Sequence, residues 1–135
     1  MTYWKESFLI GVPQIDAQHR QLFKAMDNLM EACMQGKGRT EIEKTLDFAL
    51  KYTVEHFRDE EKIQAAHAYP GLNAHKKLHA DFTVTVTDLA KEFNKSGPSV
   101  ALTGKLNKSL VDWVITHVST EDKKVGEHIK KVTKG

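Results

Sequence analysis

Apolar side chains recur every three or four residues along four stretches of the chain, the spacing that places them on one face of an α-helix. The first stretch predicts a helix over residues 16–36, with Asp16 as its N-cap and the glycine-rich segment Gly36-Lys37-Gly38 at its end. Its apolar face consists of Leu22, Met26, Leu29, Met30 and Cys33. His19 precedes Leu22 by three residues and therefore falls on the same face.

The second stretch predicts a helix over residues 40–67. Thr40 and Glu43 have the spacing of a capping box, in which their side chains satisfy free backbone N–H groups at the helix start. The segment Tyr69-Pro70-Gly71 then ends the helix, because the residue before a proline disfavours helical geometry. The inward face consists of Ile42, Leu46, Ala49, Thr53, His56, Glu60 and Ile63.

The third stretch predicts a helix over residues 71–94, whose inward positions advance by alternating steps of three and four. These positions are Leu72, His75, His79, Phe82, Val86, Leu89 and Phe93. Residues 82–87 also alternate in the manner of a β-strand and are rich in β-branched side chains. We reject the strand because the helical spacing continues through this segment, and a lone strand would have no partner.

The fourth stretch predicts a helix over residues 99–118, after a turn at Asn94–Pro98. Its inward positions are Leu102, Leu106, Leu110, Trp113 and His117. Residues 1–15 form an aperiodic arm whose apolar side chains favour packing against the body, and residues 119–135 form a short helical tail. The sequence therefore predicts one all-α domain over residues 1–135, an antiparallel up-down-up-down four-helix bundle with an N-terminal arm.

The composition of the chain indicates which partners and which cellular compartment to expect. The 135 residues include 20 basic and 18 acidic side chains, which are largely interspersed and give a formal net charge of +2. We therefore expect no nucleic-acid partner, and we interpret the basic tail as a solvated helix end. We also expect no membrane insertion, because no apolar run approaches the roughly 20 residues of a membrane helix. With no evident secretion signal and a single cysteine, Cys33, we expect a cytoplasmic protein.

Seven potential metal ligands lie among these helical positions. They are His19, His56, Glu60, His75, His79, His117 and Asp122. Residues four apart on a helix share a face, so the pairs His56/Glu60 and His75/His79 each point in one direction. Burying five imidazoles and two carboxylates without partners would be very costly, and metal ions remove that cost by coordinating them. Imidazole nitrogen and carboxylate oxygen together favour iron, zinc or manganese.

Two further points follow from the same spacing. His117 and Asp122 are five residues apart, which puts them about 140° out of phase on a regular α-helix. We therefore predict that the helix opens as a π-bulge, or ends and turns, between Val118 and Asp122. Cys33 lies about four turns from His19 and is predicted to be core packing, whereas His67 and His128 are predicted to face solvent.

The chain resembles the hemerythrin family in its single-domain bacterial form. Matching elements span residues 4–126, and all seven expected ligands are present in order. The elements are Asp16-Ala17-Gln18-His19, His56-Phe57-Arg58-Asp59-Glu60-Glu61, Tyr69-Pro70, His75-Lys76-Lys77-Leu78-His79 and Trp113-Val114-Ile115-Thr116-His117-Val118 with Asp122.

The resemblance implies a non-haem di-iron centre with two iron ions, an oxo or hydroxo bridge and dioxygen as ligand. His75, His79 and His117 would hold one iron, and His19 and His56 would hold the other, which keeps an open position for dioxygen. Glu60 and Asp122 would bridge the two irons. The residues implied to line the oxygen pocket are Leu22, Phe57, Trp113, Val114 and Val118.

This chain departs from the commoner family pattern at three positions. Val114 stands where the family usually has leucine, and Val118 stands where it usually has isoleucine. Each loses one methylene, so a looser pocket and faster autoxidation are expected. Gln64 stands where the family often has methionine, and the sequence gives no account of its effect.

Three functions are compatible with such a centre. The favoured one is reversible dioxygen binding for carriage, storage or delivery to an oxygen-consuming enzyme, by a protein that is not itself an enzyme. Di-iron oxygenases use more carboxylates, which stabilise high-valent iron, whereas five neutral imidazoles favour a carrier. The alternatives are an enzyme or detoxifier acting on nitric oxide or peroxide, and an oxygen sensor. Because no apolar face outside the predicted core is evident, we expect a monomer.

Overall fold

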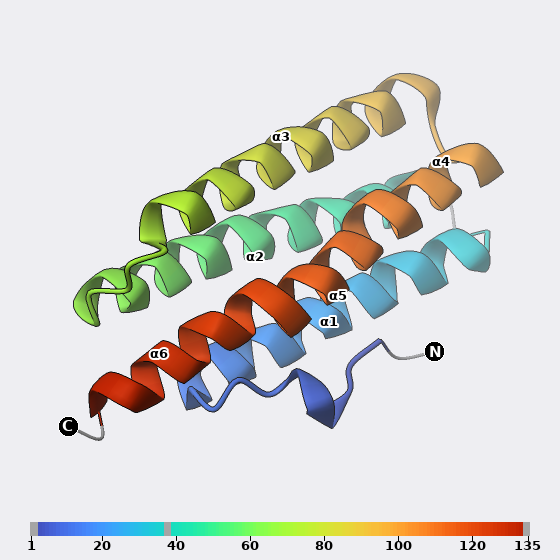
Figure 1. The fold of residues 1–135 in the computed structure, drawn as a ribbon. Coiled ribbons are helices and arrows are strands. Elements are labelled where there is room, and N and C mark those ends of the chain that lie inside the picture. The colour runs from blue at the N-terminus through green and yellow to red at the C-terminus, as the bar shows by residue number, and fades with distance from the viewer. Residues whose placement is uncertain (1–2, 37–38, 134–135) are drawn as a thin grey trace.

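Four antiparallel helical rods form the body of the protein in the computed structural model, which describes residues 3–36 and 39–133. The first three rods are α1 (Pro13–Met34), α2 (Arg39–Ala66) and α3 (Leu72–Ser96). The fourth rod runs without a break from Val100 to Thr133, and the chain reverses direction between successive rods (Figure 1). This arrangement confirms the predicted all-α four-helix bundle.

The fourth rod is longer than predicted, because the expected tail continues the helix instead of following its end. It comprises α4 (Val100–Leu106), the π-helical stretch η2 (Asn107–Asp112), α5 (Trp113–His117), a second π-helical stretch η3 (Val118–Asp122) and α6 (Lys123–Thr133). The irregularity predicted between Val118 and Asp122 is confirmed as η3, and the helix does not end there. The earlier stretch, η2, was not predicted.

The buried positions of this rod explain why it needs two π-helical stretches. One series of them recurs at every fourth residue, at Leu102, Leu106, Leu110, Val114, Val118, Asp122 and Gly126, and the other buried residues, Val111, His117, Val125 and Ile129, lie outside this series. These six steps cover 24 residues, or about 6.7 turns of regular α-helix, so the stripe would wrap well around the rod. Each π-helical stretch absorbs about one extra residue, which leaves close to six whole turns and keeps the stripe on one face.

The start of α1 corrects the prediction that Asp16 is its N-cap. The helix begins three residues earlier, with Pro13 in its first turn and Val12 as the capping residue. Asp16 is buried within the first turn, where its carboxylate accepts hydrogen bonds from the backbone N–H groups of Ile10 (2.8 Å) and Gly11 (3.2 Å). Asp16 therefore fastens the N-terminal arm to the bundle.

The arm lies along α1 and the end of the fourth rod, as its apolar content predicts (Figure 1). It contains the short 3₁₀ helix η1 (Glu6–Phe8), and the Phe8 ring stacks on Phe23 with centroids 5.1 Å apart. Ile10 approaches α6 so closely that a Cβ atom on Gly126 would collide with its backbone oxygen. The arm is thus part of the packed structure beside the first turns of α1.

The other helix ends differ little from the predictions. The second rod begins at Arg39, so Thr40 already lies inside the helix, and the expected terminating residues Lys37 and Gly38 lie outside the described part of the chain. The third rod extends two residues further than predicted and ends at Ser96, and the next residue, Gly97, caps it with a φ of 76° that favours glycine. Within the described residues, no helix combines the length and apolarity required to span a bilayer.

Candidate metal centre

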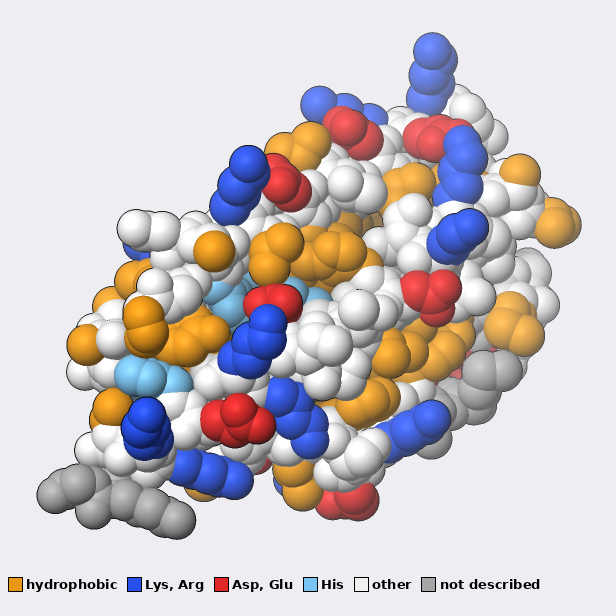
Figure 2. Space-filling view, in the orientation of Figure 1, with side chains coloured by type: hydrophobic (Ala, Val, Ile, Leu, Met, Phe, Trp, Pro, Cys, Tyr) orange, Lys and Arg blue, Asp and Glu red, His pale blue; other side chains and the backbone are white. Residues whose placement is uncertain are grey.

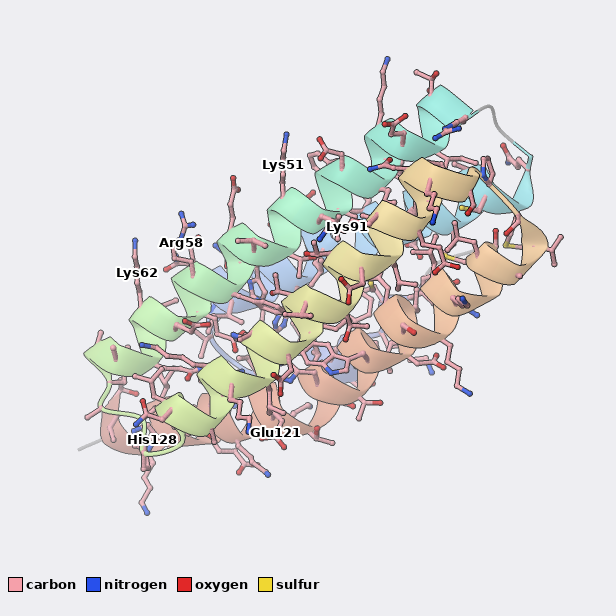
Figure 3. The ribbon with its side chains drawn as sticks, turned by 90° about the horizontal axis from the view of Figure 1, so that it is seen from above. Lys51, Arg58, Lys62, Lys91, Glu121 and His128 are labelled. Atoms are coloured by element: carbon pink, nitrogen blue, oxygen red, sulfur yellow. The ribbon has the colours of Figure 1, made fainter. Side chains whose placement is uncertain are left out.

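The structure brings the side chains of all seven predicted ligands together inside one end of the bundle. His19 comes from α1, His56 and Glu60 from α2, and the others from α3 and the fourth rod. Each of the seven residues is at most 5% exposed. On the opposite face of α2, Lys51, Arg58 and Lys62 point away from the bundle (Figure 3), so this helix separates a donor face from a solvated one.

The donor atoms fall into two groups that share both carboxylates. In one group Glu60 and Asp122 meet His75, His79 and His117, and in the other group they meet His19 and His56. Within each group the candidate ligand atoms all lie within 4.8 Å of one another. The seven side chains therefore divide into a three-histidine side and a two-histidine side.

Glu60 presents one oxygen to each side. Its Oε1 lies 2.7 Å from His75 Nε2 and 3.6 Å from His79 Nε2, on the three-histidine side. Its Oε2 lies 3.2 Å from His56 Nε2 and 3.6 Å from His19 Nε2, on the two-histidine side. This is the disposition that a carboxylate needs to link two metal ions.

Asp122 divides its oxygens in the same way. Its Oδ1 lies 3.1 Å from His75 Nε2 and 3.2 Å from His117 Nε2, whereas its Oδ2 lies 3.0 Å from His19 Nε2. The opening of the helix at η3 makes this possible, because a regular α-helix would turn Asp122 away from His117. The π-helical stretch η3 therefore places Asp122 on the same side of the rod as His117.

Several donor atoms in this cluster lack a satisfactory partner within the protein. His19 Nε2, Glu60 Oε2 and Asp122 Oδ1 are buried and make no well-aligned hydrogen bond. On the other side, His117 Nε2 lies 3.0 Å from His75 Nε2 and 3.1 Å from His79 Nε2, although neutral imidazoles cannot all donate to one another. Metal cations fit this set, since they accept lone pairs from nitrogen and oxygen at once.

The protonation of the metal-free cluster follows from its burial and its close carboxylates. Burial alone would lower the pKa of His19 and of His75, but contacts with Asp122 and Glu60 outweigh it and raise each pKa to about 9. Burial and neighbouring imidazoles instead lower the pKa of His79 to about 3. Metal binding near neutral pH must therefore displace protons from His19 and His75.

The carboxylates remain ionised in the same setting. Burial and the charge of Asp122 would raise the pKa of Glu60, but its contacts with His19, His56 and His75 lower it to about 2. Burial is likewise outweighed at Asp122, where contacts with His117, His19 and His75 hold the pKa well below its usual value. Two buried negative charges are thus available to neutralise bound cations.

Three side chains that the sequence analysis did not assign orient two of the imidazoles. Nδ1 of His56 lies 2.8 Å from Gln18 Oε1, and the Gln18 amide donates to Asp59 (2.9 Å). Nδ1 of His79 lies 2.8 Å from a carboxylate oxygen of Glu61. A proton on Nδ1 leaves the Nε2 lone pair directed into the cluster, the usual arrangement at metal-binding histidines.

The predicted pocket residues come from α1, α2 and the fourth rod. Leu22, Phe57, Val114 and Val118 are buried, and Trp113 is half-buried. The Phe57 ring stacks on His79 with centroids 3.8 Å apart. Trp113 stacks on His117 with centroids 4.4 Å apart. These aromatic contacts fix the imidazole planes and give that side of the cluster an apolar wall.

The two remaining histidines correct a prediction. Neither His67 nor His128 faces solvent freely, because both are half-buried at the end of the bundle near the turn between α2 and α3 (Figure 3). Nε2 of His128 lies 2.8 Å from the His67 carbonyl oxygen, and the rings of His128 and Tyr69 pack with centroids 5.4 Å apart. Neither histidine belongs to the two donor groups, and Cys33 does not belong to them either.

Comparison with known proteins finds the same family in a family model and in individual relatives. A model of the hemerythrin HHE cation binding domain matches residues 10–129. A bacteriohemerythrin of Methylococcus capsulatus is 30% identical over 126 residues, covering 93% of this chain and 94% of the relative. A bacteriohemerythrin of Stenotrophomonas maltophilia is 27% identical, with 94% and 80% covered. A myohemerythrin of Theromyzon tessulatum is 28% identical, with 88% and 86% covered.

Proposed function

This chain belongs to the hemerythrin family, whose function is to bind oxygen at a di-iron centre, and from that premise we propose that it binds dioxygen reversibly. The proposed ligands of the two irons are His19, His56, Glu60, His75, His79, His117 and Asp122. Bound iron would supply the electrons that hold dioxygen at the site. The chain itself supplies the ligands, their orientation and a dry environment.

The observation that favours this proposal most is the way in which both carboxylates divide their oxygens between the two donor groups. A pair of such carboxylates suits a pair of ions that share them. The three-histidine group offers one more imidazole than the two-histidine group. The ion on the two-histidine side would then keep an open position, which is the place for a small ligand to bind.

Reversible binding also requires that the site exclude water. The proposed pocket residues are Leu22, Phe57, Trp113, Val114 and Val118. Four of them are buried apolar side chains, and the half-buried indole of Trp113 covers His117. Gln18 Oε1 and the Glu61 carboxylate lie 2.8 Å from Nδ1 of His56 and of His79, and acceptors at these positions favour the tautomer whose Nε2 lone pair points into the cluster.

We further propose that the protein carries or stores oxygen, rather than acting as an enzyme. The donor set has five imidazoles and two carboxylates, so it adds little negative charge to stabilise high-valent iron. Lysine, arginine and acidic side chains are mixed over the face seen in Figure 2, between apolar patches, so this face carries no large basic surface that would favour a nucleic-acid partner. Delivery to an oxygen-consuming enzyme in the cytoplasm fits such a carrier.

Cycles of oxygenation test the proposal. The purified protein is loaded with ferrous iron under argon, its iron content is measured, and its optical spectrum is followed through alternate exposure to air and argon. We expect two irons per chain and a spectrum that returns to the reduced form without added reductant. His19→Ala serves as the matched variant, because it removes one ligand from the open side. Permanent oxidation in the first cycle would instead favour the enzyme or sensor.

A further inference from the structure

Gln64 lies fully buried on α2, one turn beyond Glu60, and contacts the donor cluster without belonging to it. Its side-chain Nε2 donates a hydrogen bond to Glu60 Oε1 at 3.2 Å. Its side-chain carbonyl oxygen has no hydrogen-bond partner. Burying an amide with one unmatched oxygen is unfavourable compared with an apolar side chain of similar size. A buried glutamine at this position is therefore expected only if its hydrogen bond to Glu60 has a role of its own.

The bond reaches only one of the two oxygens of Glu60. Oε1 is the oxygen beside His75, on the three-histidine side, whereas Oε2 faces His56 and makes no aligned hydrogen bond. A carboxylate oxygen has two lone pairs, so the amide can occupy one while the other stays directed into the cluster. Asp122 Oδ1, which also faces His75, has no hydrogen-bond partner. Gln64 thus makes the two sides of the cluster electrostatically unequal.

We propose that Gln64 is a positioning residue that weakens Glu60 Oε1 as a donor and so favours the reduced form of the iron pair. The inference rests on the ligand set of the proposed function. A hydrogen bond draws negative charge from the oxygen it reaches, and a metal bound to that oxygen then receives less charge. The lower-valent ion tolerates this better than the higher-valent ion. Because the site is buried, the effect is not diluted by solvent.

The substitution Gln64→Met tests this with little change in volume, since it removes the donor and leaves a side chain of similar length. Gln64→Leu is the second variant, in case the thioether of methionine contributes an interaction of its own. Thr53→Val is the matched control. Thr53 is also buried on α2 and its hydroxyl bonds only to the Ala49 carbonyl oxygen, so this variant removes a buried polar group outside the donor cluster.

The first measurement is a redox titration of the iron-loaded proteins under argon, so that its result does not depend on oxygen binding. Gln64→Met and Gln64→Leu should both shift the equilibrium toward the oxidised form by about tenfold, near the lower end of the range that corresponds to one hydrogen bond to a charged group. Thr53→Val should titrate like the unaltered protein. A second measurement uses the zinc-loaded proteins, in which the infrared carboxylate bands should differ from the unaltered protein only for the Gln64 variants.

The outcomes separate this inference from the proposed function. Failure to bind oxygen reversibly, with the shifts at Gln64 present, would reject the carrier role and leave the inference standing. Reversible binding with equal titrations and equal infrared bands in all proteins would overturn the inference alone. Folded Gln64 variants that no longer hold two metal ions would also overturn it, because the amide would then be required for assembly rather than for tuning.

Discussion

The two ends of the bundle consist of the same four rods but differ in the side chains through which the rods meet. At the far end the rods meet through apolar side chains such as Leu29, Phe93 and Leu106, which satisfy one another by contact alone. At the donor end the rods meet through imidazoles and carboxylates, several of which have no aligned partner in the protein. The apolar end is therefore complete as the chain folds, whereas the donor end is complete only with cations. The side chains that need cations are thus separated along the bundle axis from those that do not.

The largest expected effect comes from removing a carboxylate that both donor groups share. Glu60→Ala should weaken the binding of both metal ions by more than about 100-fold, since losing a residue that merely orients a ligand already costs about 10–100-fold. Metal analysis after equilibrium dialysis measures the effect. Glu55→Ala is the matched control, because Glu55 is an exposed carboxylate on the same helix. A Glu60→Ala protein that retains both ions would contradict the proposed bridging role.

The next effect concerns how the stability of the metal-free protein depends on pH. The folded-state pKa of about 9 at His19 and His75 exceeds the ordinary value of 6.5, so their stabilisation is fully present below pH 6.5 and is lost as the pH rises to about 9. The depressed pKa of His79, about 3, acts oppositely and lowers stability as the pH falls below 6.5. We therefore expect a maximum near pH 6.5.

Urea unfolding at a series of pH values measures this profile. Zinc-loaded protein should lose the decline between pH 6.5 and 9, because the metal has already displaced the protons from His19 and His75. Leu29→Ala should lower the whole profile without changing its shape, since that residue lies at the apolar end. A metal-free protein whose stability is constant between pH 6.5 and 9 would show that these protons are not bound as the contacts imply.

A smaller and more uniform effect is expected at the apolar end. Leu29 is fully buried, and Leu29→Ala leaves a cavity that should reduce the free energy of unfolding by about 2–5 kcal/mol. The loss should be similar with and without bound metal, and the number of ions held should stay the same. Denaturant unfolding and metal analysis check both parts. If the variant also loses metal, the two ends are coupled and the separation described above is wrong.

Much of this organisation could be predicted from the sequence. Helical spacing shows which side chains share a face of a helix, and in a bundle the apolar faces contact one another. The η3 irregularity was predictable, since His117 and Asp122 could not otherwise share a site. The η2 stretch was missed because no functional pair spans it, although the four-residue spacing from Leu102 to Gly126 contains the signal. Periodicity thus predicts a backbone irregularity when two positions that must meet fall out of phase.

The side-chain contacts that orient the ligands could not be predicted from helical spacing. Gln18 and Asp59 meet across α1 and α2, and that pairing depends on how the two helices are rotated and on the rotamers chosen. Glu61 reaches His79 from a neighbouring helix for similar reasons. His128 was expected in solvent, yet it packs near His67 because the fourth rod continues past the donor end. Single-helix periodicity shows which face is inward, and it does not show which side chains of two helices touch.

The smallest expected effect concerns how tightly the donor end is closed. Val114 is buried about one turn before His117 on the same rod and has one methylene fewer than leucine. Val114→Leu should fill residual space in the proposed oxygen pocket, hinder water from reaching the irons and slow autoxidation by a factor of about two to five, the range of a fraction of a kcal/mol to one kcal/mol. The rate is followed in air as the oxidised form appears in the optical spectrum. Leu110→Met, a substitution of similar volume further along the same buried stripe, controls for general repacking. Equal rates in the unaltered and Val114→Leu proteins would mean that closure at this position does not limit oxidation, whereas a faster rate would mean that the added methylene forces the pocket open.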